Sequence, residues 1–131
     1  MDQENIKNPF IEYCGMQVHY EGDGQYYMTV ELKPEYMNPY GQVHGGFLFT
    51  MIDTTAGYNA RKFMIKPVTL DCNVHYYRNV AEGTIRSHAV IVKRGRKVSV
   101  VRAQVLSESG RVLAEGEVTY YETGDFENAG K

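Results

Sequence analysis

The stretch GGFLFTMIDTTAGYNARKF, residues 45–63, is the only long segment of the chain with a helical pattern. Little of it is polar, and a helix that is apolar on nearly all sides is normally buried. Arg61 and Lys62 in its last turn suit the negative end of the helix dipole, and Pro67 lies just beyond. The sequence therefore predicts one central helix that the other elements enclose. The positions expected in the interior are Phe47, Leu48, Met51, Ile52, Thr55, Ala56, Tyr58 and Asn59.

The segments around this helix have the pattern of β-strands. They run over residues 17–21, 25–32, 68–77, 83–93, 97–108 and 111–121. Gly22-Asp23-Gly24 favours a hairpin between the first two strands. We therefore predict an α+β fold in which an antiparallel six-stranded sheet wraps around one long central helix. One helix cannot cover both faces of such a sheet, so a second copy of the chain is expected to cover the rest.

Two further segments have a clear spacing of side chains: a predicted short helix and one predicted strand. Ile6, Phe10 and Tyr13 recur at helical spacing in a predicted short helix over residues 6–13. Residues 68–77 alternate, which separates their side chains into two sets. Val68, Leu70, Cys72, Val74 and Tyr76 fall on one face, and Thr69, Asp71, Asn73, His75 and Tyr77 fall on the other.

Length and composition indicate a single globular domain. Residues 1–131 form that domain, with a core over about residues 8–121 and a polar tail over 124–131. A hydrophobic share of 43% and a charged share of 23% exclude a disordered chain. No apolar run approaches the roughly 20 residues of a membrane-spanning helix, and the polar N-terminus lacks the features of a signal peptide. We therefore expect a cytoplasmic protein that makes no membrane contact.

Charge, cysteines and histidines narrow the classes of ligand. A formal net charge of −2 argues against a surface made for nucleic acid. Cys14 and Cys72 lie far apart in the sequence, which fits reduced thiols. The four histidines have no spacing typical of metal ligands. We expect no nucleic-acid partner, no metal and no separate cofactor.

The loop that leads into the long helix has three features that favour chemistry. Gly45 and Gly46 lie where the loop becomes the helix, and the first N–H groups of a helix have no internal partner. Without side chains, these glycines let a ligand oxygen approach, as in an oxyanion hole or anion site. Asp53 is an acid inside an otherwise apolar helix and suits a general base or a nucleophile. Asn38 is a neutral amide that suits the orientation of water or a carbonyl group.

Each of these features also has a purely structural interpretation. A glycine pair before a helix is often only a tight turn, and an acid in mid-helix often faces solvent or bonds the neighbouring backbone. His44 fits a helix cap or a packed histidine as well as a catalytic group. The combination of the three features on one surface of one helix favours the chemical interpretation.

Four cations surround one glycine in Lys93-Arg94-Gly95-Arg96-Lys97, between two predicted strands. One interpretation is an exposed hairpin tip whose charges discourage edge pairing. The other is a clamp for phosphate groups, which arginine binds through two parallel hydrogen bonds. The extended basic stripe and the stacking platform of a nucleic-acid site are missing.

The spacing Asn-x2-Gly-x2-His-Gly-Gly-x6-Asp, residues 38–53, resembles the signature of a known family. It is similar to that of hotdog-fold acyl-CoA thioesterases of the phenylacetate-degradation (4-hydroxybenzoyl-CoA thioesterase-like) type. The resemblance covers about residues 8–121. Further segments that resemble this family are residues 8–15, 68–76, 95–105 and 109–114. The chain departs from the pattern at Tyr77-Arg78-Asn79 and at Thr54-Thr55, where the family has Arg-Pro and small apolar residues.

The resemblance implies a hotdog fold and a homodimer with two sites at its interface, often paired into a tetramer. Asp53 would be the catalytic carboxylate that activates water or attacks the thioester, and the N–H of Gly45 would polarise the carbonyl group. Asn38 and His44 would position the reacting group. Thr69 would reach across from the other subunit to help hold water.

The implied substrate is an acyl-CoA thioester, so coenzyme A is part of the substrate. The resemblance favours the clamp for the phosphates of coenzyme A, which assigns Gly46, Arg94, Gly95, Arg96 and Lys97 to substrate binding. Two alternatives stay open. One is an acyl-CoA binding or sensor protein without catalysis, and the other is an acyl-thioester hydratase or dehydratase that pairs His44 with Asp53. The sequence does not determine the acyl group, nor does it separate coenzyme A from an acyl carrier protein.

Overall fold

The computed structural model describes residues 8–22 and 24–124, which form two α-helices, one 3-10 helix and six strands. The elements in chain order are α1 (Pro9–Tyr13), β1 (Gln17–Tyr20), β2 (Tyr26–Glu31), η2 (Pro34–Tyr36), α2 (Gly45–Ala60), β3 (Pro67–Tyr76), β4 (Thr84–Lys93), β5 (Val98–Leu106) and β6 (Val112–Glu122). The six predicted strands and the long helix are therefore confirmed, with ends that differ by at most three residues. Ile6 and most of the predicted tail lie outside the described residues.

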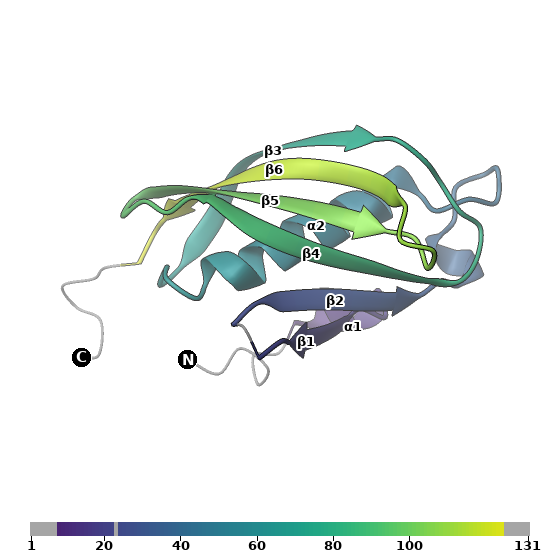
Figure 1. Cartoon of the computed structure of the whole chain (residues 1–131), viewed down its shortest axis with the longest axis horizontal. Helices are drawn as coiled ribbons and strands as arrows, with labels where there is room; N and C mark the ends of the chain where they lie inside the picture. Colours follow the sequence, from purple (N-terminus) through teal and green to yellow (C-terminus); the bar gives the residue numbers. More distant parts are fainter. Residues whose placement is uncertain (1–7, 23, 125–131) are drawn as a thin grey trace.

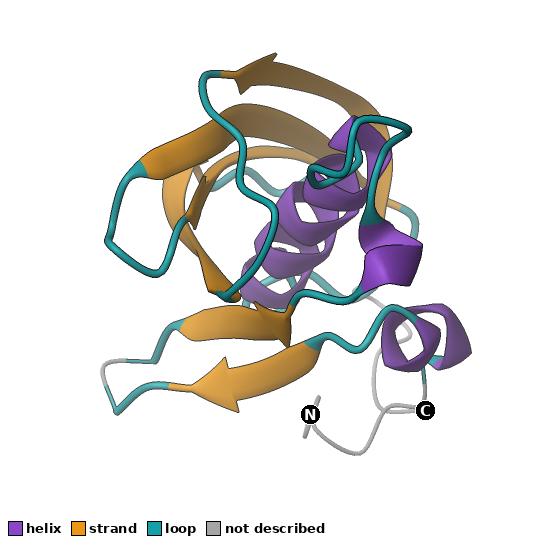
Figure 2. Cartoon of the chain, turned by 90° about the vertical axis from the view of Figure 1, so that its right-hand side faces the viewer, coloured by secondary structure: helices purple, strands orange, loops and turns teal. Residues whose placement is uncertain are grey.

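The six strands form a single antiparallel sheet in the order β1-β2-β4-β5-β6-β3. Strand β3 follows α2 in the sequence but pairs with β6 at the far edge of the sheet. Figure 1 shows the sheet lying along α2, and Figure 2 shows it curling around the helix. This is the α+β hotdog fold that the sequence predicts.

The interior lies between α2 and the concave face of the sheet. All eight side chains predicted to be buried on this helix are buried, none with more than 8% of its surface exposed. Gly116 of β6 lets the two layers approach, because a Cβ atom there would lie 3.1 Å from Cγ2 of Ile52. Helix α2 ends at Ala60, so Arg61 and Lys62 lie beyond its last turn, which corrects the prediction. The Lys62 ammonium instead donates to the carbonyl oxygen of Gly24, 2.8 Å away.

Buried polar side chains fix the helix against the sheet. Asn59 of α2 is fully buried, and its amide oxygen accepts a hydrogen bond from the Tyr26 N–H, 3.0 Å away. Its amide nitrogen donates to the carbonyl oxygens of Tyr26, at 2.9 Å, and Thr55, at 3.0 Å. The hydroxyl groups of Thr55 and Ser87 are hydrogen-bonded to each other. Thr55, one of the two departures from the family pattern in α2, therefore joins the helix to β4.

Strand β3 contains a β-bulge that changes which side chains face the helix. The register against β6 shifts between Thr69 and Asp71. As a result Thr69 contacts α2, and so does Cys72, which packs against the core. The alternation predicted for residues 68–77 is therefore wrong at Thr69, because a bulge adds one residue and changes the phase of a strand. Asp71 lies on the opposite, exposed face.

The spacing of Phe10 and Tyr13 in the first helix does not mark its buried side. Helix α1 begins at Pro9, and Asn8 caps it through a hydrogen bond from the Ile11 N–H. Ile11 is the buried side chain, whereas Phe10 and Tyr13 are 59% and 85% exposed. Ile11 is the one side chain of this five-residue helix that is buried, and it belongs to the hydrophobic core.

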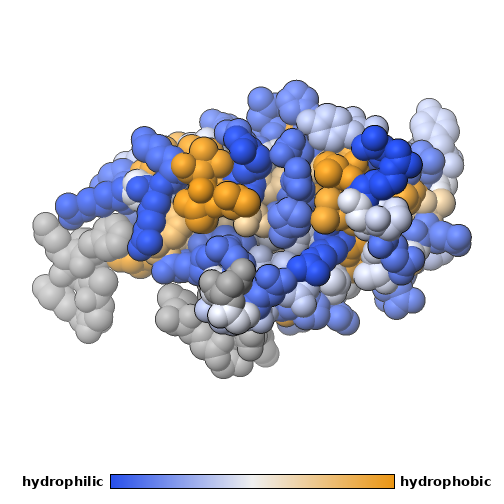
Figure 3. Space-filling model, viewed as in Figure 1, coloured by the Kyte–Doolittle hydropathy of each residue, from blue (hydrophilic) through white to orange (hydrophobic). Residues whose placement is uncertain are grey.

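The convex face of the sheet, which points away from α2, is not covered by another element of the described chain. Figure 3 shows two apolar patches on it with polar side chains between them. An Arg102–Glu117 ion pair, with atoms 2.8 Å apart, crosses β5 and β6, while Val90 and Val92 of β4 are exposed. None of the helices in the described part of the chain is both long and apolar enough to cross a membrane.

Candidate active site

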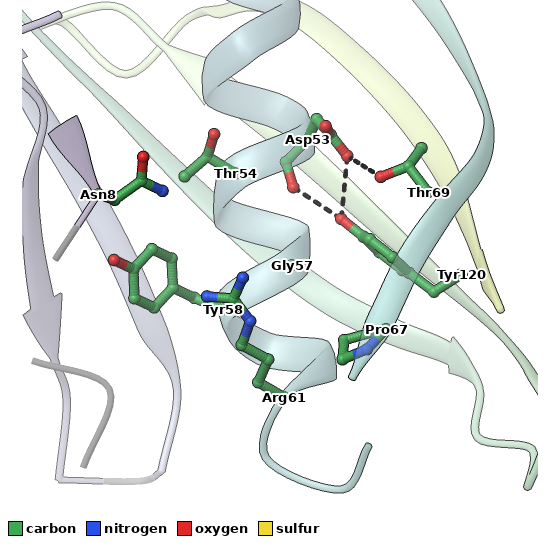
Figure 4. Close-up of a pocket in the computed structure, with 9 residues that line it drawn as sticks. All are labelled: Asn8, Asp53, Thr54, Gly57, Tyr58, Arg61, Pro67, Thr69 and Tyr120. Atoms are coloured by element: carbon green, nitrogen blue, oxygen red, sulfur yellow. Dashed lines mark hydrogen bonds between the residues drawn. The ribbon is translucent and has the colours of Figure 1, made fainter. Parts of the chain in front are cut away.

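Asp53 of α2, Thr69 of β3 and Tyr120 of β6 meet at the helix surface (Figure 4). The Thr69 hydroxyl donates a hydrogen bond to Oδ1 of Asp53, 2.8 Å away. The Tyr120 hydroxyl lies 3.1 Å from the same carboxylate oxygen and 2.6 Å from the backbone oxygen of Asp53. Three elements therefore fix the position of this carboxylate. Helix α2 carries it, and β3 and β6 supply the hydroxyl groups that contact it.

Thr69 reaches Asp53 within one chain, which corrects the expectation that it comes from the other subunit. The bulge in β3 explains the contact, because without it the Thr69 side chain would share the outward direction of Asp71. Sequence reasoning missed Tyr120 as a site residue. The available signal was the alternation of the last strand, which places Tyr120 on the buried face, where a phenol hydroxyl needs a partner.

The groups around Asp53 are held in their neutral forms. Burial, and then the negative charge of Asp53, raise the pKa of the Tyr120 phenol far above its ordinary value. Burial, with smaller contributions from Asp53 and Asp71, raises the pKa of the Cys72 thiol to about 11. Tyr120 therefore stays a hydrogen-bond donor at any physiological pH, and Cys72 is a poor nucleophile.

A pocket of about 170 Å³ opens beside this carboxylate. Arg61 stands at its rim with its guanidinium 5.6 Å from the centre of the Tyr58 ring. Thr54, the second departure from the family pattern in α2, is part of the wall. The lining is therefore mostly polar. The residues around the pocket are Asn8, Asp53, Thr54, Gly57, Tyr58, Arg61, Pro67, Thr69 and Tyr120.

The N-terminus of α2 is organised by His44. Its Nδ1 atom accepts a hydrogen bond from the Gly46 N–H, 2.8 Å away, so His44 is the helix cap. That bond occupies the N–H of Gly46, one of the predicted ligand donors. The Gly45 N–H has no hydrogen-bond acceptor within residues 8–22 and 24–124, while the Gly45 carbonyl oxygen accepts from Tyr76, 3.0 Å away. Gly45 therefore offers a free donor at the positive end of the helix dipole.

Asn38 shapes the loop ahead of this donor. Its side-chain oxygen accepts hydrogen bonds from the N–H groups of Tyr40, at 2.9 Å, and Gln42, at 3.1 Å. Its own N–H donates to the Gln42 carbonyl oxygen at 2.6 Å. The amide oxygen is thus used within the loop, and the NH₂ group is what the side chain has left to offer a substrate.

Gly45 and Asp53 do not converge within one chain. They are eight residues apart on α2, which separates them by about 12 Å along the axis and about 80° around it. The expectation that they share one surface of the helix is therefore wrong. A thioester carbonyl bound to one of these groups cannot reach the other in the same chain. His44 is still further along the axis from Asp53, so one chain does not pair them either.

The cationic segment Lys93-Arg94-Gly95-Arg96-Lys97 connects β4 to β5. The Arg94 guanidinium lies 4.7 Å from the centre of the Phe63 ring, just past the C-terminal end of α2. The Ser99 hydroxyl accepts from the Gly95 N–H at 3.0 Å and holds the turn. Figure 1 shows this turn at the opposite end of the helix from Gly45. In the described ranges, no cluster of three His, Cys, Asp or Glu side chains could hold a metal ion.

A sheet curled around one helix, with an acid in mid-helix and a free N–H at its start, defines a hotdog-fold hydrolase of thioesters. Residues 40–114 match the family model of the Thioesterase superfamily, and the chain belongs to this family. The resemblance seen in the sequence is thereby confirmed.

Two similar proteins agree with this membership, and a third shares the fold. "Putative esterase VNG_1336C" of Halobacterium salinarum is 31% identical over 113 residues, which cover 80% of this chain and 74% of that protein. A mutant structure of the phenylacetic acid degradation protein PaaI from Thermus thermophilus is 26% identical with a TM-score of 0.80, over 88% of this chain and 99% of that one. The BH2602 protein from Bacillus halodurans, solved with CoA, is 23% identical with a TM-score of 0.86, over 92% and 82% of the two chains.

The charge of Asp53 can be tested through Cys72. The Asp53→Asn variant removes one of the negative charges that disfavour the Cys72 thiolate, so the pKa of Cys72 should fall from about 11 toward its ordinary value. At a fixed pH of about 9, iodoacetamide should then label Cys72 faster in the variant. Mass spectrometry of each cysteine over a pH series measures this. Cys14 is the internal control, because burial alone raises its pKa. An unchanged labelling profile of Cys72 would contradict the electrostatic contact.

Proposed function

We propose that the protein is an acyl-CoA thioesterase that hydrolyses an acyl-coenzyme A thioester to the free acid and CoA. The observation that carries the proposal is the Asp53 carboxylate, fixed by the Thr69 hydroxyl at the wall of a pocket. Membership of the thioesterase superfamily supports the reaction class. The BH2602 protein, which shares the fold and was solved with CoA, supports the carrier.

The chemistry assigns different tasks to the two ends of the site. Attack on a thioester carbonyl places negative charge on its oxygen, and the free Gly45 N–H at the helix N-terminus is a donor for that charge. Water is a poor nucleophile at neutral pH. The Asp53 carboxylate therefore either takes a proton from the attacking water or attacks the carbonyl carbon itself. Collapse of the adduct expels CoA, whose sulfur takes up a proton that comes from water. In the route of direct attack, a water molecule then hydrolyses the anhydride between Asp53 and the acyl group, which frees the acid and restores the carboxylate.

The separation of Gly45 and Asp53 requires a second copy of the chain. A complete site forms when the N-terminal end of α2 of one protomer faces Asp53 and Thr69 of its partner. Strand β3 supports this arrangement, because it is an edge of the sheet and exposes Val68 and Leu70, at 47% and 58%. An exposed apolar edge strand pairs readily with another chain. The active unit is thus a homodimer with two sites, and Asn38 and His44 belong to the Gly45 side of each.

The cationic turn supplies the contact to the phosphates of coenzyme A. Arg94, Arg96 and Lys97 bring positive charges onto a turn that the Ser99 hydroxyl stabilises. The turn lies at the Asp53 side of the proposed shared site, past the C-terminal end of α2. An antiparallel arrangement of two protomers brings it beside the partner's helix N-terminus, where the thioester would be bound.

Hydrolysis is measured by thiol release from short, medium, long and aryl acyl-CoA esters. The Asp53→Asn variant should lose activity by about 10²- to 10⁴-fold, because the group that activates water is gone. The matched control is Asp71→Asn, which removes an exposed carboxylate from the opposite face of β3 and should keep wild-type activity. Equal activity of both variants would remove Asp53 from the mechanism. Tight acyl-CoA binding by the wild type without thiol release would favour a sensor.

The phosphate clamp is tested by the double variant Arg96→Gln/Lys97→Gln. Loss of two cations should raise KM for acyl-CoA about tenfold at low salt and leave kcat unchanged, because the phosphates are remote from the reacting carbonyl. The same acyl group on N-acetylcysteamine, which has no phosphates, is the control substrate and should show no change. A lower kcat with unchanged KM would contradict the assignment.

A further inference from the structure

The Tyr120 hydroxyl has one hydrogen and lies beside two acceptors of Asp53, with the Thr69 hydroxyl as a third hydrogen-bonding neighbour. The backbone oxygen lies 2.6 Å away and the carboxylate Oδ1 lies 3.1 Å away (Figure 4). A hydroxyl donates to one acceptor at a time, so its hydrogen bonds either the backbone oxygen or the carboxylate of Asp53.

We propose that Tyr120 is a positioning residue of the thioesterase reaction, which, with Thr69, anchors Oδ1 of Asp53 and leaves Oδ2 as the reacting oxygen. This inference rests on the proposed function and adds to it the atom that acts and the residue that selects it. Both hydroxyl donors contact Oδ1. Within the part of the chain that the structure describes, no group donates a hydrogen bond to Oδ2.

Two hydrogen-bond donors on different strands fix the orientation of the Asp53 carboxylate. The last torsion of an aspartate is broad and nearly two-fold, so its two oxygens exchange places easily. Thr69 approaches from β3 and Tyr120 from β6, which leaves one orientation in which both bonds form. The Tyr120 ring itself cannot swing away, because only 3% of its surface is exposed.

Gly57 provides the space for this contact. It lies one turn after Asp53 on α2, where a glycine is unfavourable for the helix. A Cβ atom at this position would lie 3.3 Å from the Tyr120 hydroxyl oxygen. That is closer than a carbon and an oxygen normally pack, so the hydroxyl or the helix would have to shift. A glycine at this position in the helix therefore leaves the space in which the Tyr120 hydroxyl approaches Asp53.

Few ionisable groups compete with Tyr120 for the Asp53 carboxylate. On β3 the neutral Cys72 thiol is near enough to feel its charge, and on α2 Tyr58 and Arg61 line the same pocket. Of these, only Arg61 carries a charge near neutral pH, and the structure shows no contact between it and the carboxylate. The two hydroxyl groups are thus the direct partners.

The test is the Tyr120→Phe variant, with Tyr121→Phe as the matched control on the exposed side of the same strand. A hydrogen bond to a charged group is lost, so kcat should fall about 10- to 100-fold with KM within about twofold. Tyr121→Phe should leave both quantities unchanged.

Gly57→Ala keeps the phenol but crowds its hydroxyl, and it completes a double-mutant cycle. Alone it should lower kcat, whereas in the Tyr120→Phe background it should have no further effect, because the crowded atom is absent. A Tyr120→Phe enzyme with wild-type kcat would overturn the inference, as would a Gly57→Ala effect on kcat of equal size in both backgrounds. If Asp53→Asn is inactive in the same assay, such a result leaves the proposed function standing. A wild type without thioesterase activity would overturn both.

Discussion

A helix that is apolar on almost every side has to be enclosed, and this constraint sets the rest of the structure. The sheet curls around α2 because Leu48, Met51 and Ile52 leave the helix no solvent face on that side. The few polar groups on the helix must then find partners in the sheet. Asn59 finds the backbone of β2, and Asp53 finds hydroxyl groups on β3 and β6. The hydroxyl groups that satisfy Asp53 also hold its carboxylate in place at the candidate active site.

The sheet does not enclose the helix completely. The proposed active site lies at the uncovered edge formed by β3. Strand β3 is the last strand of the sheet and exposes apolar side chains, and the proposed dimer uses this edge. The same edge carries Thr69 and borders the pocket at Asp53. The donor at Gly45 lies about two turns away on the helix, beyond the reach of one carbonyl group. The proposed arrangement, in which a partner completes each half-site, would account for both the exposed edge and this distance.

Much of the fold followed from periodicity, whereas the details of the site did not. The burial of α2 could be predicted because apolar residues occur around its whole circumference, and Asp53 stood out against them. The contact of Thr69 depends on a bulge in β3, which shifts a strand by one residue without a clear sequence signal. Alternation along the last strand is a signal for the face of Tyr120, but which helix residue it meets depends on how the sheet curls. The distance between Gly45 and Asp53 was available from helix geometry and rules out a site made by one chain.

The most direct test of a site shared between protomers is to mix two inactive variants. Gly45→Pro removes the N–H at the first helical position, where proline is tolerated, and His44 with ψ of 134° suits a following proline. Asp53→Asn removes the carboxylate. After random subunit exchange, about half of the dimers are hybrids, and each hybrid has one site free of both changes. The account predicts recovery of about a quarter of wild-type thiol release on mixing. Activity that stays at the level of the separate variants would contradict it, because a site built within one chain is never restored by exchange.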